Sequence, residues 1–132
     1  MSLLVDTDIC SAHLKNKGSM AHRFIQHGGR IHVSTITAME LYTWAFRHRH
    51  LPARVDLVDE LLSVIEVIPV DQLIARRAGE VRGLILEVGR DIAPTDLIIA
   101  ATALVHDLTL VTHNTRDFQA VPGLRLDDWL AS

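Results

Sequence analysis

The segment from residue 97 to 105 contains no charged side chain and, as a helix, would be apolar on nearly every side. A helix of that kind must be covered by protein on most of its surface, so we expect it to be central and buried. The segment is far shorter than the roughly 20 residues that a membrane-spanning helix requires. Other elements of the chain must therefore pack around it.

Short apolar strands alternate with helices along the rest of the chain. The predicted strands cover residues 3–5, 31–33, 64–70, 108–112 and 124–126. The predicted helices cover residues 7–15, 20–27, 37–50, 53–63, 72–88 and 96–105, with Ser19 and Asp71 as caps of the second and fifth. Strands that alternate with helices form a parallel sheet with helices on both faces. We therefore expect a three-layer α/β/α domain with a central parallel sheet of about five short strands.

The length and composition indicate one ordinary globular domain. A chain of 132 residues can bury one core, so we expect residues 1–132 to form a single domain. The formal net charge of -3 provides no global basic field, so contact with nucleic acid must use a local patch. Cys10 has no partner for an internal disulfide, which fits a reducing compartment. Asp6 and Asp8 interrupt the first apolar run, which is unlike a signal peptide, and we expect a cytoplasmic protein.

Four carboxylates lie where strands end or a helix begins: Asp6, Glu40, Asp96 and Asp117. A parallel sheet brings such strand ends to one crevice, where several like charges cannot all ionise without a compensating cation. Mg²⁺ or Mn²⁺ prefers carboxylate and water oxygens and can activate a water for attack on a phosphodiester. The placement of the acids predicts a metal-dependent nuclease.

Each acid also has an ordinary structural explanation. Asp6 can cap the first helix. Glu40 completes the capping-box pattern that begins at Thr37, and Asp96 complements the dipole in the first turn of its helix. Asp117 can support a turn in which Asn114 is the cap. Only the joint placement of the four favours a functional site.

The motifs that contain these acids resemble those of the PIN-domain ribonucleases, and more narrowly of the VapC-type toxins of toxin-antitoxin pairs. Residues 3–9 resemble the opening hydrophobic-Asp-Thr-Asn/Asp segment, and residues 34–41 the segment with the second acid. Residues 94–101 are similar to the third motif, which is the most specific match, and residues 110–124 to the fourth. The resemblance covers almost the whole chain.

The resemblance implies a PIN-like fold and an endoribonuclease that cleaves RNA with a metal-activated water. It implies that Asp6, Glu40, Asp96 and Asp117 are the catalytic, Mg²⁺-binding residues. It assigns Thr112 and Asn114 a supporting role in orienting the cluster or its waters. Asp8 stands where many members carry Asn, and it either joins the site or caps the helix. The resemblance also implies a homodimer and a cognate VapB-type antitoxin whose tail covers the active site.

Residues 47–50 form the densest basic run, and Arg82 lies on a later helix. Arg47, Arg49 and Arg82 are candidates for RNA contact, although a basic run at a helix end also simply complements the dipole. The aromatic residues near Trp44 fit core packing or a protein interface.

Two other functions remain open at this point. Asp6-Thr7-Asp8 after a strand also resembles the DxD opening of phosphoryl-transfer hydrolases, but those generally need a late lysine, and the only lysines are Lys15 and Lys17. A non-catalytic PIN-like protein that binds RNA or a partner is the second alternative. In that case the acids serve only as caps.

Overall fold

The computed structural model describes residues 2–15, 20–47 and 52–131. Its core is one sheet of five strands in the order β3-β2-β1-β4-β5, and all neighbouring strands are parallel. The strands are β1 (Leu3–Val5), β2 (Ile31–Ser34), β3 (Glu66–Ile68), β4 (Thr109–Val111) and β5 (Leu126–Asp127). The predicted three-layer α/β/α fold with about five short parallel strands is confirmed.

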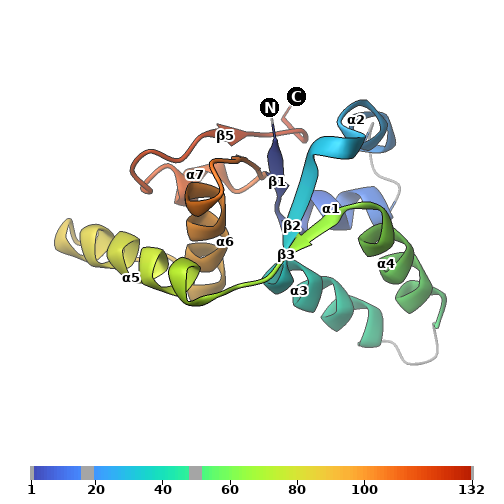
Figure 1. Cartoon of the computed structure of the whole chain (residues 1–132), viewed down its shortest axis with the longest axis horizontal. Helices are drawn as coiled ribbons and strands as arrows, with labels where there is room; N and C mark the ends of the chain where they lie inside the picture. The colour runs from blue at the N-terminus through green and yellow to red at the C-terminus, as the bar shows by residue number, and fades with distance from the viewer. Residues whose placement is uncertain (1, 16–19, 48–51, 132) are drawn as a thin grey trace.

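Helices cover both faces of the sheet (Figure 1). On one face lie α5 (Gln72–Glu87), α6 (Pro94–Val105) and α7 (Thr115–Phe118). On the other lie α1 (Thr7–Leu14), α2 (Met20–Gln26), α3 (Thr35–Phe46) and α4 (Ala53–Val64), with a short 3-10 helix, η1 (Gly28–Arg30), leading into β2. No helix in the described ranges is long and apolar enough to cross a membrane.

Strand β1 contributes to two separate cores because its side chains alternate between the faces of the sheet. Leu4 packs into the core beneath α5 and α6, whereas Leu3 and Val5 pack into the core beneath α1, α3 and α4. All three β1 residues are buried, as expected for the central strand of a sheet that is covered on both faces.

Helix α6 is the buried helix that the apolar segment predicts. Pro94 occupies its first turn, where the missing N–H has no intrahelical partner to lose. Six of its residues are buried, and the hydroxyl of the one polar residue among them, Thr102, donates to the Ile98 carbonyl at 2.7 Å. This internal hydrogen bond allows a threonine to lie in an apolar environment.

The caps of two helices differ in how well they match the prediction. Helix α3 begins at Thr35 with Ser34 as its cap, and the Ser34 Oγ accepts a hydrogen bond from the Ile36 N–H at 3.1 Å. The prediction that Thr37 and Glu40 form a capping box is therefore wrong, because both residues lie inside the helix. The cap by Asp71 is confirmed, since its Oδ1 accepts from the Ile74 N–H at 2.9 Å. Ser19 and residues 48–50 lie outside the described residues.

The order of the strands creates a switch point at β1. The chain crosses from β1 to β2 on one side, and β4 pairs with β1 on the other. In open parallel sheets, ligands bind in the crevice beyond the carboxyl ends of the strands at such a point. The residues that follow β1, β2 and β4 are therefore those that can build a site.

Candidate functional site

Asp6 lies directly after β1 and is only 6% exposed. Its Oδ1 accepts from the Thr7 N–H at 2.7 Å, and its Oδ2 accepts from the Thr112 hydroxyl at 2.8 Å. Burial, and next the charge of Asp8, raise the pKa of Asp6 to about 7, although both hydrogen bonds act to lower it. Asp6 is thus both the cap of α1 and a buried carboxylate that gains from a nearby cation.

Glu40 reaches the same region from α3. The Thr7 hydroxyl donates to the Glu40 Oε1 at 2.6 Å, which joins the first turn of α1 to the middle of α3. Thr7 was not among the predicted site residues, and its place between two acids in the sequence is the one signal for it. The hydrogen bond from Thr7 fixes the orientation of the Glu40 carboxylate, a residue that the sequence also allowed as part of a capping box.

Asp96 lies in the first turn of α6 and is partly buried. Burial raises its pKa, and the charges of Glu40, Asp117 and Asp8 raise it further, in that order. Since such effects weaken with distance, they indicate that these three acids, which come from different parts of the chain, lie near Asp96. The helix dipole alone would have favoured its ionised form.

Asp117 lies on α7 and is joined to the loop after β4. The Asn114 side-chain amide donates to the Asp117 Oδ2 at 3.2 Å, and the Asn114 N–H donates to the Thr112 hydroxyl at 3.0 Å. Asn114 occupies the N-cap position of α7, as predicted, but its side chain makes no cap hydrogen bond. Its amide instead orients an acid of the site.

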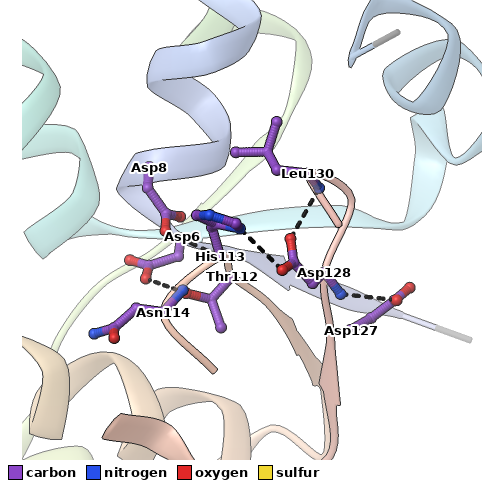
Figure 2. Close-up of polar contacts among 8 residues, drawn as sticks. All are labelled: Asp6, Asp8, Thr112, His113, Asn114, Asp127, Asp128 and Leu130. Carbon is purple, nitrogen blue, oxygen red and sulfur yellow. Dashed lines mark hydrogen bonds and ion pairs between the residues drawn. The ribbon is translucent and has the colours of Figure 1, made fainter. Parts of the chain in front are cut away.

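Asp8 faces the same loop from the first turn of α1. Its Oδ2 accepts from the His113 N–H at 3.0 Å, while its Oδ1 is buried without a hydrogen-bond partner. Burial is the main cause of a raised pKa at Asp8. Figure 2 shows Asp6 and Asp8 beside the loop of Thr112, His113 and Asn114. We call the five carboxylates the acid cluster: Asp6, Asp8, Glu40, Asp96 and Asp117.

The acid cluster has the donor chemistry of a site for a hard cation. All its donors are carboxylate oxygens, which Mg²⁺ and Mn²⁺ prefer, and the unpartnered Oδ1 of Asp8 and the buried carboxylate of Asp6 would both gain from a positive charge. Within the described ranges, however, no three His, Cys, Asp or Glu side chains are arranged so that they could hold a metal ion. The cluster is a group of neighbouring acids and not a closed metal cage.

The candidate RNA-contact residues differ in their surroundings. Arg82 on α5 is paired with Asp91, through bonds of 3.3 Å to Oδ1 and 3.1 Å to Oδ2. Arg47 is exposed at the end of α3, the helix that carries Glu40. Arg49 lies outside the described residues.

Comparison with known proteins places this arrangement in a family. The PIN domain model matches residues 3–124. The tRNA(fMet)-specific endonuclease VapC of Shigella flexneri is 34% identical over 130 residues, which are 98% of this chain and 98% of that protein. Ribonuclease VapC2 of Haemophilus influenzae is 28% identical over 131 residues, which are 98% of this chain and 99% of that protein.

Solved structures agree with the sequence relatives. A chain in the structure of DNA-bound VapBC from Salmonella typhimurium matches with a TM-score of 0.92 and 32% identity, over 98% of both chains. A chain of VapBC2 from Rickettsia felis, bound to a DNA fragment from its promoter, matches with a TM-score of 0.90 and 27% identity, over 98% of this chain and 99% of that one. The chain therefore belongs to the PIN-domain family, and its relatives within that family are VapC ribonucleases.

Proposed function

We propose that this protein is a divalent-metal-dependent endoribonuclease and the toxin of a toxin-antitoxin pair. The observation that carries the proposal is the acid cluster beyond the carboxyl ends of β1 and β4, at the switch point of the sheet. In the described part of the chain, none of the ion pairs of Lys, Arg or His involves an acid of this cluster. The names of the relatives from Shigella flexneri and Haemophilus influenzae support RNA as the substrate class.

Asp6, Glu40, Asp96 and Asp117 are the residues that we assign to metal binding and catalysis. A bound Mg²⁺ or Mn²⁺ would bind the scissile phosphate and lower the pKa of a water molecule. Asp6 and Asp96 are the main proposed ligands, because burial and neighbouring acids raise the pKa of each carboxyl group and make its charged form dependent on a cation. Thr112 and Asn114 support the cluster by donating to Asp6 and Asp117.

Glu40 is the residue that we assign to the attacking water. The Thr7 hydroxyl holds its Oε1 at 2.6 Å, so the carboxylate has a fixed orientation. A carboxylate that is not fully occupied by the cation can orient a water molecule and accept its proton as the phosphodiester is attacked. Removing the carboxylate charge should therefore affect the rate of cleavage more than the binding of RNA.

Binding of RNA would use local cations, since the chain has a net charge of -3. Arg47 extends from the end of the Glu40 helix into solvent and is our first candidate for a phosphate contact. Arg82 would first have to exchange Asp91 for a phosphate. Contacts of this kind make RNA affinity fall as salt rises.

An antitoxin of the VapB type and a second copy of the chain are the proposed partners. The VapBC structures from Salmonella typhimurium and Rickettsia felis support an antitoxin partner. An apolar groove between α2 and α4, with Ile25 82% exposed and Val64 71% exposed, offers a surface for an apolar segment. On α3, Phe46 is 59% exposed and stacks on Tyr42, which supports a protein interface there.

Cleavage of end-labelled RNA by the purified protein tests the proposal, with initiator tRNA as the first substrate. We expect cleavage with Mg²⁺ or Mn²⁺ and none with EDTA. Asp96→Asn should reduce the rate at least about 1000-fold, because it removes a charge needed to hold the cation. The matched control is Asp56→Asn, since Asp56 also lies in the first turn of a helix but is exposed on α4.

Two results would contradict the proposal. Cleavage by Asp96→Asn at the wild-type rate would show that the acid cluster is not the active site. A wild-type protein that binds RNA in the presence of Mn²⁺ without cutting it would favour the non-catalytic PIN-like alternative.

A further inference from the structure

The loop after β4 contacts three of the five acids through three successive residues. The Thr112 hydroxyl donates to Asp6 at 2.8 Å, and the Asn114 side-chain amide donates to Asp117 at 3.2 Å. Between them, the backbone N–H of His113 donates to Asp8 at 3.0 Å. The position of this one loop therefore sets the positions of three carboxylates at once.

The C-terminal segment in turn holds the loop, as Figure 2 shows. The Thr112 N–H donates to the Asp127 carbonyl at 2.9 Å. The His113 ring contacts Asp128, with 2.9 Å between Nδ1 and Oδ2. Because a carboxylate can only accept, this contact assigns the proton of the ring to Nδ1.

The Asp128 carboxylate is held on both oxygens. Its Oδ1 accepts from the Leu130 N–H at 2.8 Å, and its side chain is only 16% exposed. The next residue, Trp129, is 5% exposed and packs against α2 and the residue after it, with Phe24 edge-on at 5.7 Å and His27 stacked at 5.3 Å. The segment is thus a fixed support, whereas the side chain of His113 is 60% exposed.

We propose that Asp128 is a positioning residue of the nuclease site. It holds His113 and thereby keeps in place the Asp8 carboxylate, which we add here to the proposed ligands of the cation. The inference rests on the proposed function. It adds to the acid cluster a residue that touches neither RNA nor metal. Partners that orient a metal ligand from behind typically change metal affinity or activity by about 10- to 100-fold when removed.

A purely structural role for Asp128 is the competing explanation, since its Oδ1 also caps the turn at Leu130. The two roles use different oxygens, so they can be separated through His113. His113→Ala removes the contact to Oδ2 and leaves the cap intact. His113→Asn keeps a side-chain N–H donor at about the same place and should restore the contact.

Calorimetric titration of the full-length protein with Mn²⁺ is the first measurement. We expect Asp128→Ala and His113→Ala each to weaken Mn²⁺ binding by about tenfold. His113→Asn should remain within about twofold of wild type, and the double variant Asp128→Ala/His113→Ala should be no weaker than the single variants, because both act through one contact. Asp127→Asn is the control, since the Asp127 carboxylate accepts only from the N–H of Asp128 among the bonds described.

Amide hydrogen exchange gives a second measurement that needs no metal. The His113 N–H, which donates to Asp8, should exchange faster in Asp128→Ala and His113→Ala than in wild type. The Leu110 N–H, which donates to the Arg125 carbonyl in the sheet, should be unchanged. If Asp128→Ala fails to fold, the pair His113→Ala and His113→Asn decides the question.

The outcomes separate this inference from the proposed function. Suppose that the wild-type protein binds Mn²⁺ and cleaves RNA, and that both alanine variants keep its Mn²⁺ affinity and its exchange rate at the His113 N–H. This result would overturn the positioning role of Asp128 and leave the proposed nuclease function intact. Loss of thermal stability in His113→Ala without loss of Mn²⁺ affinity would assign the contact a structural role only. A wild-type protein that neither binds Mn²⁺ nor cleaves RNA would overturn both.

Discussion

The two ends of the sheet carry ionisable side chains in opposite arrangements. At the amino end, basic and acidic side chains are paired around a cavity: His32 lies 3.2 Å from Glu66, and Arg125 lies 2.9 Å from Asp107. At the carboxyl end, the acid cluster gathers five carboxylates, with no such ion pair to any of them in the described ranges. The acids at the amino ends of the strands thus have basic partners. The acids of the cluster at the carboxyl ends have no such partner among the described residues.

This difference distinguishes acids that are paired with basic groups from the acids to which we assign a reaction. Exposed ion pairs contribute little to stability and need nothing further. Buried acids without a cation destabilise the folded state, and such strain is typical of sites that bind a ligand. The following changes should act differently at the two ends.

The largest effect should come from Asp6, whose pKa is raised from 3.8 to about 7. Between these pH values the unfolded chain loses the Asp6 proton while the folded protein keeps it, so rising pH destabilises the wild type. Asn at this position cannot titrate. The unfolding free energy of Asp6→Asn minus that of wild type should therefore increase from pH 4 to pH 7, by on the order of 4 kcal/mol.

Urea unfolding in EDTA across this pH range measures the Asp6 effect. Asp56→Asn serves as the exposed control, for which the difference from wild type should stay nearly constant. If the difference in unfolding free energy between Asp6→Asn and wild type also stays constant with pH, the pKa of Asp6 is not raised in the folded protein.

Glu40→Gln and Glu66→Gln compare the same substitution at the two ends. We expect Glu40→Gln to lower kcat for RNA cleavage by about 100-fold with little change in KM, because the carboxylate acts on the attacking water. Glu66→Gln should leave kcat unchanged, since Glu66 pairs with His32 at the amino end. Single-turnover and steady-state rates on the same labelled RNA give both constants. Equal effects at the two ends would remove the distinction between them.

Thr7→Val tests the bond that orients Glu40. Loss of the 2.6 Å hydrogen bond should lower the unfolding free energy by about 1 kcal/mol and reduce kcat less than Glu40→Gln does. Thr7→Ser keeps the hydroxyl and should behave like wild type. If Thr7→Val leaves kcat unchanged, the bond to Glu40 has no part in catalysis.

The smallest effect is expected at Arg125. Its pair with Asp107 is exposed on both sides, so Arg125→Met should change the unfolding free energy by at most about 1 kcal/mol. RNA cleavage should keep its wild-type rate. A loss of activity in this variant would mean that the amino end of the sheet also takes part in function.

The fold was predictable because its signals are local. The apolar segment of α6, the alternation of strands and helices and the cap at Asp71 are patterns that depend on near neighbours in the chain. The start of α3 was harder, because Ser34 and Thr37 can both cap a helix. Strand β2 ends at Ser34, and this decides the choice.

The acids of the candidate site were predictable only as a set, and one of them, Glu40, lies in the middle of α3 and not at a strand or helix end. Their partners were not, because a bond such as that between Thr7 and Glu40 depends on how two helices pack on the sheet. The contact of His113 with Asp128 depends on the pairing of β4 with β5. No periodicity or motif in the sequence carries that information. Whether the four predicted acids bind a cation together stays a prediction.

The bonds of the loop after β4 have a consequence for the order of synthesis. Asp6 and Thr112 are 106 residues apart in the sequence, and Asp8 and His113 are 105 apart. A ribosome that is still making this chain therefore carries a protein whose site has not closed. Nascent chains that end before Thr112 lack these hydrogen bonds, so we expect them to be inactive as the proposed nuclease.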